Sequence, residues 1–244
     1  MRYTITQPRA WTPQDTSLLL QLKQQGLSTA QIAAQLNRSQ VSISVKLKRL
    51  SKANNTYNTP HLQEKYQINS NFLDHLNPTS ILDAYCGQKS FYSKSPATVY
   101  TNDKNPAIPA LYHMDALHLL CHLYTKKQTF DLIDLDPFGS AYDCFDLAIK
   151  MANKGLIITL GELGHKRFKR LDYVSSHYGI TSLQDFTIDN LITHIQSIGK
   201  RNKKALTVYA KKEWRNIGRV WFTISPIKIT SQWDKSNNNN HENA

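Results

Sequence analysis

FDLIDLDPFGS, residues 130–140, is the stretch of the sequence that decides the fold. Apolar residues dominate positions 130–135, which predicts a buried β-strand that carries acids toward its carboxyl end. Asp136 comes next, and the Pro-Phe-Gly run after it ends the strand. Because ligands bind beyond the carboxyl ends of the strands in an open α/β sheet, this stretch predicts both a central strand and a binding site.

Similar short apolar runs lie on both sides of this stretch, separated by helical or loop segments. They are SILDAYC (80–86), ATVYTND (97–103) and GLIITLG (155–161). This alternation predicts an α/β fold, a parallel sheet with helices on both faces. Two later runs, ALTVYAKK (205–212) and RVWFTISPI (219–227), are separated by a turn-like segment and predict an antiparallel hairpin.

The composition indicates a basic, globular protein. The chain has 30 Lys and Arg against 18 Asp and Glu, a net charge of +12, and 40% of its residues are hydrophobic. Basic side chains gain free energy when they release counterions from phosphates, so we expect a polyanionic partner such as a nucleic acid. The alternative is a basic protein that has no such partner.

The three cysteines, Cys86, Cys121 and Cys144, are widely spaced and form neither a CxxC pair nor a Cys/His cluster. The sequence therefore predicts no disulfide framework and no metal site, and it fits a reducing compartment. No apolar run approaches the ~20 residues that cross a membrane, and the N-terminus lacks the apolar core of a signal peptide. We expect a cytoplasmic protein outside the membrane.

Residues 1–52 hold eight Lys and Arg and a single acid. The pattern predicts three short helices, the first opened by Trp11-Thr12-Pro13, the second capped by Ser28 and the third over residues 40–50. Residues 11–50 resemble the Myb-like and transposase-type helix-turn-helix, whose last helix enters the major groove of DNA. A small helical bundle with a solvated or protein-binding basic face is the alternative.

The helix-turn-helix resemblance implies two sets of contacts with DNA. Four residues would face base edges: Ser39, Gln40, Ser42 and Lys46. Three others would contact phosphates: Arg38, Lys48 and Arg49.

Composition also predicts the domain boundaries. The polar segment SKANNTYNTP (51–60) lacks periodicity, and KSNNNNHENA (235–244) is of low complexity. We therefore expect a helix-turn-helix domain over 1–52, a linker over 53–60, a larger α/β domain over 61–234 and a disordered tail over 235–244.

Ile81-Leu82-Asp83-Ala84-Tyr85-Cys86-Gly87 leads from a strand into a turn with a glycine, where the backbone can approach a ligand. This run resembles motif I of the class I S-adenosylmethionine (SAM)-dependent methyltransferases. The resemblance implies a Rossmann-like sheet whose last strand inserts antiparallel, and SAM as the cofactor. Lys89 stands where the family often has a second glycine.

The same resemblance suggests which residues hold SAM. Asp83 would lie near the methionine end, with Tyr85 and Gly87 around the same turn. Asp103, at the end of the next strand, would accept the ribose hydroxyls, or would only cap the turn before Pro106. Asp115 stands where the family bonds the adenine amino group, and a helix N-cap explains it equally well.

The run DPFG (136–139) resembles the D/N-P-P-Y/F signature of amino-group methyltransferases and is closest to the tRNA (guanine-N2) dimethyltransferases. An exocyclic amine is a poor nucleophile because its lone pair is delocalised into the ring. A carboxylate and a backbone carbonyl that accept its two hydrogens localise that lone pair toward the SAM methyl. The resemblance implies that Asp136 supplies the carboxylate, Pro137 holds the loop and Phe138 stacks on the extruded base.

A second basic run follows the strand predicted at 155–161. Its four cations are Lys166, Arg167, Lys169 and Arg170. They are candidates to hold a phosphate backbone, and solvated loop charge is the alternative.

Together the motifs predict a SAM-dependent methyltransferase that acts on an exocyclic base amine of a nucleic acid. The helix-turn-helix resemblance favours DNA, at adenine N6 or cytosine N4, since a helix rarely enters the narrow A-form major groove of RNA. The DPFG resemblance favours RNA, and a noncatalytic DNA-binding regulator is a third reading, disfavoured by the acids at three strand ends. The target base, target sequence and oligomeric state stay open.

Overall fold

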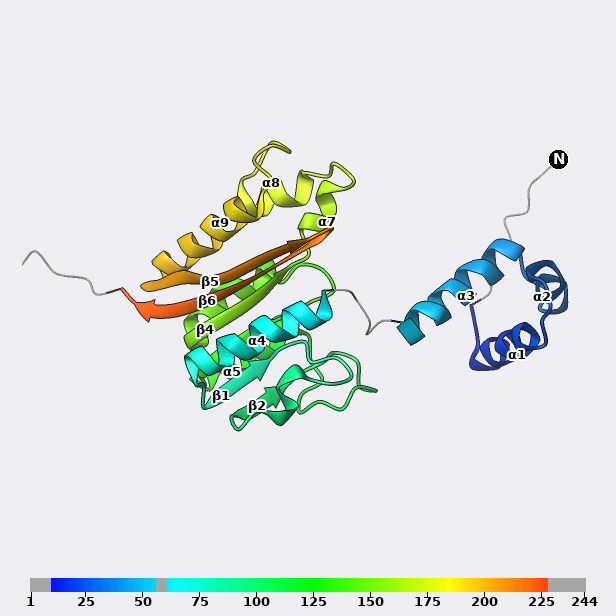
Figure 1. The fold of residues 1–244 in the computed structure, drawn as a ribbon, viewed down its shortest axis with the longest axis horizontal. Helices are drawn as coiled ribbons and strands as arrows, with labels where there is room; N and C mark the ends of the chain where they lie inside the picture. Colours follow the sequence, from blue (N-terminus) through cyan, green and yellow to red (C-terminus); the bar gives the residue numbers. More distant parts are fainter. Residues whose placement is uncertain (1–9, 56–60, 228–244) are drawn as a thin grey trace, which may run out of the picture. The chain divides into compact units, whose positions relative to one another are not determined.

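The computed structural model of this chain describes residues 10–55 and 61–227 (Figure 1). These residues belong to two compact units, one ending at Leu62 and the other beginning at Gln63. Residues 56–60 of the predicted linker and the whole predicted tail, 235–244, lie outside the described residues.

Three helices form the first unit. They are α1 (Pro13–Gln24), α2 (Thr29–Gln35) and α3 (Gln40–Asn55). Thr12 caps α1 and Ser28 caps α2, each in a capping box that satisfies backbone N–H groups of the first turn. No Gly or Pro interrupts α3, which continues to Asn55, so the first three residues of the predicted linker are helical. The buried core of the unit consists of Leu19, Leu22, Ile32, Ala33, Leu36 and Ile43.

A six-stranded sheet with the order β2-β1-β3-β4-β6-β5 forms the centre of the second unit. The strands are β1 (Ser80–Asp83), β2 (Thr98–Thr101), β3 (Phe130–Leu135), β4 (Ala152–Leu160), β5 (Lys204–Trp214) and β6 (Ile217–Pro226). The first four strands pair in parallel, and β6 runs antiparallel between β4 and β5. The predicted α/β sheet and its C-terminal hairpin are confirmed, with the last strand inserted as the resemblance implied.

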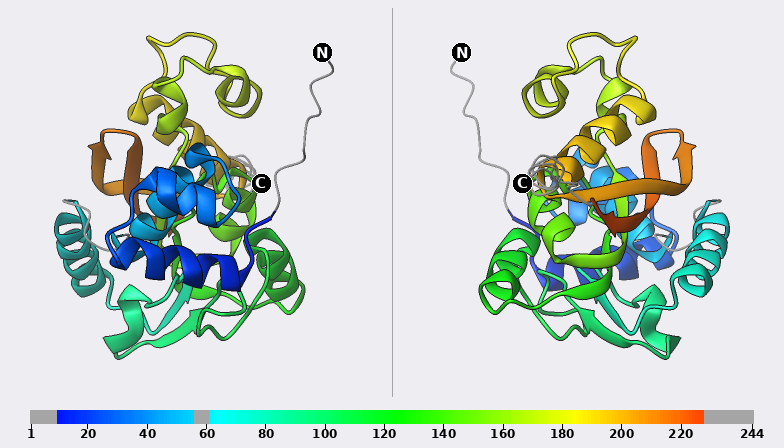
Figure 2. Two further views of the ribbon diagram at one scale, coloured as in Figure 1. Left: turned by 90° about the vertical axis from the view of Figure 1, so that its right-hand side faces the viewer. Right: turned by 90° about the vertical axis from the view of Figure 1, so that its left-hand side faces the viewer.

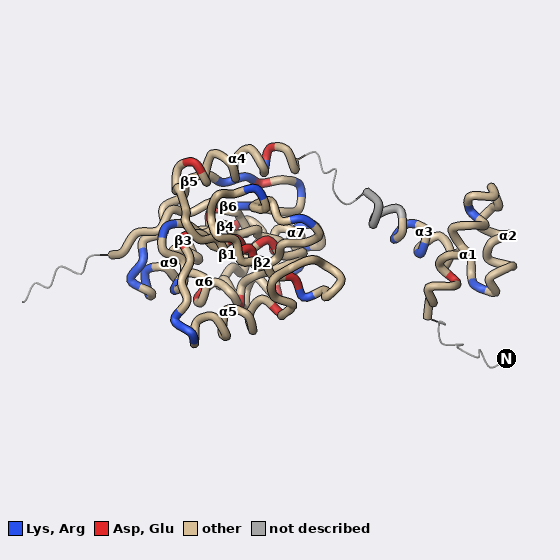
Figure 3. The backbone as a smooth tube through the Cα atoms, turned by 90° about the horizontal axis from the view of Figure 1, so that it is seen from below, with Lys and Arg blue, Asp and Glu red and all other residues tan. Residues whose placement is uncertain are grey.

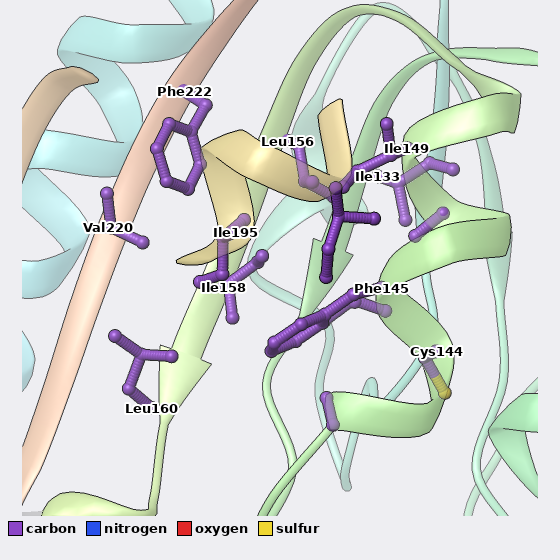
Figure 4. Packing of buried hydrophobic residues seen from close by; sticks show 14 of the residues in the cluster. Ile133, Cys144, Phe145, Ile149, Leu156, Ile158, Leu160, Ile195, Val220 and Phe222 are labelled. Atoms are coloured by element: carbon purple, nitrogen blue, oxygen red, sulfur yellow. The ribbon is translucent and has the colours of Figure 1, made fainter. Parts of the chain in front are cut away.

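Helices cover both faces of this sheet (Figures 1 and 2). On one face lies α4 (Leu62–Leu76), and on the other lie α5 (Ala116–Thr125), α6 (Phe145–Met151) and α9 (Ile188–Arg201). Alternate residues of a strand face opposite sides, so Ile157 of β4 packs in the cluster with Phe72 of α4. Its neighbour Ile158 packs with Phe145 of α6 and Ile195 of α9 (Figure 4).

Short helices and turns follow the parallel strands. They are η1 (Phe91–Lys94) after β1, η2 (Tyr142–Cys144) after β3, and α7 (Leu163–Lys166) and α8 (Asp172–Tyr178) after β4. Because parallel strands end at one edge of the sheet, these segments meet there and surround any site at that edge. No helix of the described residues is long and apolar enough to cross a membrane. The same residues contain no group of three or more His, Cys, Asp or Glu side chains arranged to hold a metal ion.

Candidate active site

Three acids meet where β1 and β3 end. Asp83, the last residue of β1, pairs in register with Asp134 of β3, and Asp136 follows two residues later. Asp83 and Asp134 are buried, whereas the Asp136 side chain is 30% exposed. Carboxylates buried this closely require compensating cations or protons.

Arg219 supplies the main compensating charge. It lies on β6 opposite Thr159 of β4, and its side chain is 1% exposed. Its guanidinium donates to Asp134 Oδ2 at 2.6 Å and lies 3.1 Å from Asp136 Oδ1. The hydroxyl of Tyr92 also donates to Asp134 Oδ2, at 2.6 Å. A buried arginine therefore bridges two acids and holds the ends of β3, β4 and β6 together.

Asp136 has the surroundings of a permanently ionised acceptor. The hydroxyl of Thr159 donates to its Oδ1 at 2.6 Å, and the ammonium of Lys65, on α4, donates to its Oδ2. Burial raises the pKa of Asp136, but the charges of Arg219 and Lys65 and the hydrogen bonds outweigh it and lower that pKa to about 2.

The acceptor positions of Asp136 can be counted. An ionised carboxylate has about four lone-pair positions, two on each oxygen. The Thr159 hydroxyl uses one position on Oδ1, near which the Arg219 guanidinium lies as an ion-pair partner, and Lys65 uses one on Oδ2. Among the described residues, one position on Oδ2 therefore stays available to a ligand.

The pKa of Asp83 is shifted in the opposite direction. Burial and the neighbouring charge of Asp134 raise the pKa of Asp83 to about 7, although a hydrogen bond from Ser90 lowers it. That bond joins Ser90 Oγ to Asp83 Oδ2 at 2.5 Å. A cation placed beside Asp83 would favour its ionised form.

The turn after β1 is tied to the end of β2. Gly87 has a left-handed backbone (φ +59°), which suits glycine, and its N–H donates to Asp103 Oδ2 at 3.2 Å. Asp103 Oδ1 accepts the Asn105 N–H at 2.8 Å, so the turn-capping reading is also observed. Asp103 is only partly buried.

Two other predicted SAM residues have structural partners. Asp115 is exposed and caps α5, since its Oδ1 accepts the Leu117 N–H at 3.0 Å. Tyr85 is partly buried, and its hydroxyl lies 3.8 Å from Cys144 Sγ. The helix-cap reading of Asp115 is thus sufficient to explain that residue.

The DPFG loop is held by the turn that follows β4. Pro137 is buried, whereas Phe138 is fully exposed. A Cβ atom on Gly161 would overlap the carbonyl oxygen of Gly139, so this close approach requires glycine. The loop therefore presents Phe138 outward from a well-packed base.

Glu162 anchors the other end of the same loop. This buried acid accepts hydrogen bonds from the Ser140 hydroxyl and, at 2.9 Å, from the Tyr178 hydroxyl. Burial raises the pKa of Glu162. Tyr173 adds a third member, because its hydroxyl donates to Ser140 Oγ at 2.9 Å. The network connects the DPFG loop to α8.

Sequence reasoning missed Arg219, Lys65 and Glu162. Arg219 is a lone charge inside the apolar run RVWFTISPI, and such a position signals a buried, paired cation. Glu162 directly follows the run GLIITLG, as the other candidate acids follow their strands. Lys65 lies in a polar helix, where the sequence offers no signal, and only the tertiary structure brings it to Asp136.

In the first unit, Arg38 is buried and not placed for phosphate contact. Its guanidinium donates to Asp15 Oδ2 at 2.7 Å and to the Ala10 carbonyl at 2.8 Å, and it lies 4.1 Å from the centre of the Trp11 ring. Its side chain is 5% exposed. This geometry speaks against the predicted phosphate contact, because the guanidinium is covered and already paired with Asp15.

The residues predicted to contact DNA from α3 differ in exposure, and Gln40, Lys48 and Arg49 are exposed. Ser42 and Lys46 are partly buried, and the Lys46 ammonium lies 5.4 Å from the Trp11 ring centre. Among the α3 side chains that the structure describes, five exposed ones form a stripe: Val41, Ser44, Val45, Lys48 and Arg49. Gln40, at the start of the helix, is exposed too but lies on the side of Ile43. Ser39, just before α3, is exposed as well. Ile43 sets the inward side of the helix, and the stripe lies opposite to it.

The second basic run, residues 166–170, is exposed to solvent. All four of its cations are exposed: Lys166, Arg167, Lys169 and Arg170. The guanidinium carbons of Arg167 and Arg170 lie 5.5 and 5.6 Å from the ring centre of Phe168, which is itself exposed. These positions suit either predicted reading, a phosphate contact or solvated charge.

The sequence matches no protein-family model and no curated protein. Among solved structures, Trm1 from Pyrococcus horikoshii, in complex with S-adenosyl-L-methionine, superposes with a TM-score of 0.57 at 18% identity. The match covers 70% of this chain and 56% of that Trm1 chain. An O-methyltransferase from Bacillus cereus in complex with SAH has a TM-score of 0.44 at 11% identity, over 90% of this chain and 93% of that one. The similarity to Trm1 shows that this chain has the class I SAM-dependent methyltransferase fold.

Proposed function

We propose that this chain is a SAM-dependent methyltransferase that modifies an exocyclic amino group of a nucleic-acid base, with DNA as the preferred substrate. The observation that carries the proposal is the Asp136 carboxylate. Its low pKa keeps it ionised, it has one open acceptor position, and it lies two residues from the fully exposed Phe138.

The residues of the β1–β2 side fit the charged and polar groups of SAM. The carboxylate of Asp83 would bind the methionine ammonium, and that of Asp103 the ribose hydroxyls. The hydrogen bond from Gly87 to Asp103 supports this pairing, because it brings the two turns together. When bound, SAM supplies an electrophilic methyl group.

Asp136 would orient the target amine. The open position on Oδ2 accepts one amine hydrogen, and a backbone carbonyl of the DPFG loop accepts the other. These two bonds localise the nitrogen lone pair for attack. Because a carboxylate with a pKa of about 2 is a weak base, its contribution is orientation and not proton removal. The surplus proton of the methylated amine would pass to water.

Phe138 would hold the base itself. An enzyme that acts on a base inside a duplex must extrude it, and an aromatic face compensates for the lost stacking. The contact of Gly161 with Gly139 supports this role, because it restrains the loop that carries Phe138.

The first unit supports DNA as the substrate. The exposed stripe of α3 combines Lys48 and Arg49, suited to phosphates, with Val41 and Val45, which are suited to thymine methyl groups in a major groove. RNA is the second candidate, supported by the DPFG resemblance and by the structural similarity to Trm1.

Transfer of labelled methyl from SAM to duplex DNA and to bulk tRNA, followed by nucleoside analysis, tests the proposal. We expect label in an amino-methylated base of DNA. Label in tRNA alone would make RNA the substrate, and label in neither would contradict the proposed function.

Two variants of the first unit test its role in DNA binding. Val41→Glu puts an acid on the α3 stripe, where it repels phosphates, and should weaken binding to duplex DNA without changing SAM affinity. Leu20→Glu is the matched control, since Leu20 is an exposed leucine on α1 away from that stripe. Equal DNA affinities of the two variants would remove α3 from the interface.

A further inference from the structure

A basic hollow lies between α7 and the turn that joins β5 to β6. Its volume is about 270 Å³. It is lined by Leu163, Lys166, Arg167, Glu213, Arg215 and Asn216. The lining carries three cations and one acid, so the hollow has a net positive charge. Figure 3 shows Lys and Arg residues gathered near α7 and β6.

The strand register places this hollow at the edge that carries the candidate active site. Leu160, which ends β4, pairs with Gly218 of β6, and Thr159 pairs with Arg219. The β5–β6 turn therefore lies beyond the carboxyl end of β4, next to the residues that hold Asp136. From the other side, α7 directly follows Glu162, which anchors the DPFG loop.

Packing keeps α7 and the turn together. A Cβ atom on Gly218 would approach the side chain of Leu163 to 2.8 Å, so glycine allows α7 to sit closely on the start of β6. Leu163 is buried. The two sides of the hollow are thus held at a short separation by apolar contact.

The cations of the hollow differ from their neighbours on the hairpin. Lys211 forms an ion pair with Asp189, and Lys212 forms one with Glu64. Within the part of the chain that the structure describes, Lys166, Arg167 and Arg215 have no such acidic partner. Cations that converge on a hollow without neutralising acids attract an anion from outside the protein.

We propose that this hollow binds a phosphodiester group of the nucleic-acid strand beside the target base. The inference rests on the proposed function, and it names the contact that positions the substrate backbone. Guanidinium groups suit a phosphate because they donate pairs of parallel hydrogen bonds, and the Asn216 amide adds a neutral donor. Glu213 lowers the net charge of the lining to about +2, which is enough for one or two phosphodiester groups and too little for a longer run.

The salt dependence of binding tests the hollow. We would measure the affinity of the full chain for a fluorescein-labelled, mixed-sequence DNA duplex, and for bulk tRNA, over a series of salt concentrations. The slope of log K against log salt is negative, and Arg215→Gln should make it less steep by about 1, the effect of losing one phosphate contact. The control is Lys212→Gln, which removes the same charge three residues earlier on the same hairpin and should leave the slope nearly unchanged.

Calorimetric titration with SAM shows whether each variant is folded. If Arg215→Gln fails to bind SAM, the double variant Lys166→Gln, Arg167→Gln replaces it, because both side chains are exposed. Equal slopes for the wild type and the hollow variants would contradict phosphate binding in the hollow. The proposed methyl transfer would not be affected by that result. If the wild type binds SAM but neither nucleic acid, the proposed function fails together with the hollow.

Discussion

Asp83 and Asp136 lie at the same edge of one sheet, yet their carboxyl groups have opposite pKa shifts. Asp83 is buried beside Asp134 with a hydroxyl as its partner, and its pKa is raised to about 7. Asp136 is paired with Arg219 and Lys65, and its pKa is lowered to about 2. Among the described residues, Asp83 therefore forms no ion pair, whereas Asp136 forms two.

This difference separates two kinds of site on one edge. A buried acid without a cation is stabilised by a positively charged ligand, and SAM is such a ligand. An acid already ionised by its own protein partners is a ready acceptor for the hydrogens of an amine. Changes on the β1–β2 side should alter SAM affinity, and changes on the β3–β4 side should alter methyl transfer.

The largest effect is expected at Asp136. Asp136→Ala removes the only acceptor side chain assigned to the target amine, so methyl transfer should be lost while SAM still binds. Asp136→Asn keeps one oxygen and should retain some activity if the target is adenine or cytosine. Label transfer and SAM calorimetry on both variants check this, and near-normal turnover by Asp136→Ala would contradict the mechanism.

Arg219 should have the next largest effect, on stability. Arg219→Met leaves Asp134 buried without its cation, and breaking a buried ion pair costs about 3–5 kcal/mol of the free energy of unfolding. Urea unfolding measures the loss. Lys211→Met is the control, because its pair with Asp189 is exposed and should be worth about 0–1 kcal/mol. Similar losses for the two variants would show that Arg219 does not hold the edge together.

The sequence predicted where Asp83 and Asp136 lie, but not the direction of their pKa shifts. Apolar runs and the turn residues after them are local signals, so the sheet and the strand-end positions of Asp83 and Asp136 could be predicted. The partners that decide their pKa values are not local. Arg219 is 85 residues from Asp134 in the sequence, and Lys65 is 71 residues from Asp136. Which acid is ionised therefore depends on the tertiary structure.

Burial decides which side chains the first unit presents. The positions of the helices follow from caps and periodicity, but the outward face of α3 depends on which apolar residues form the small core. Ile43 is in that core, and Val41 is 72% exposed, although both are β-branched apolar residues of one helix. Hydrophobicity alone does not distinguish them, so the sequence does not show how far Ser42 and Lys46 are covered, and their contact with base edges stays a prediction.

A variant of Phe138 tests binding of the target base separately from SAM binding, because Phe138 is assigned to the base alone. Phe138→Ala should weaken productive base capture by roughly 1–3 kcal/mol, the usual contribution of one stacked base. Its stability should not change, since the side chain is fully exposed. Steady-state kinetics with the nucleic-acid substrate measures the effect, and an unchanged kcat/KM would remove Phe138 from the base site.

A variant of Asp103 tests the proposed SAM site on the β1–β2 side of the sheet edge. Asp103→Ala removes the proposed ribose acceptor and should weaken SAM binding at least tenfold, about 1.4 kcal/mol. Asp74→Ala is the control, since Asp74 is an exposed acid of α4 with no assigned role in SAM binding. Calorimetry would show unchanged SAM affinity for Asp103→Ala if Asp103 only caps its turn.

The smallest expected effect is the pH dependence of SAM binding, which distinguishes the ionisation of Asp83 from that of Asp136. With a pKa of about 7, Asp83 is largely protonated at acidic pH and must lose its proton to pair with the SAM ammonium. The affinity for SAM should therefore rise with pH and be about fivefold weaker at pH 6 than at pH 7. Asp136, with its pKa of about 2, is ionised throughout this range and adds no pH dependence. Asp83→Asn should bind SAM more weakly and with no change over these pH values, whereas a wild type that binds equally well at both would show that Asp83 does not face the cofactor.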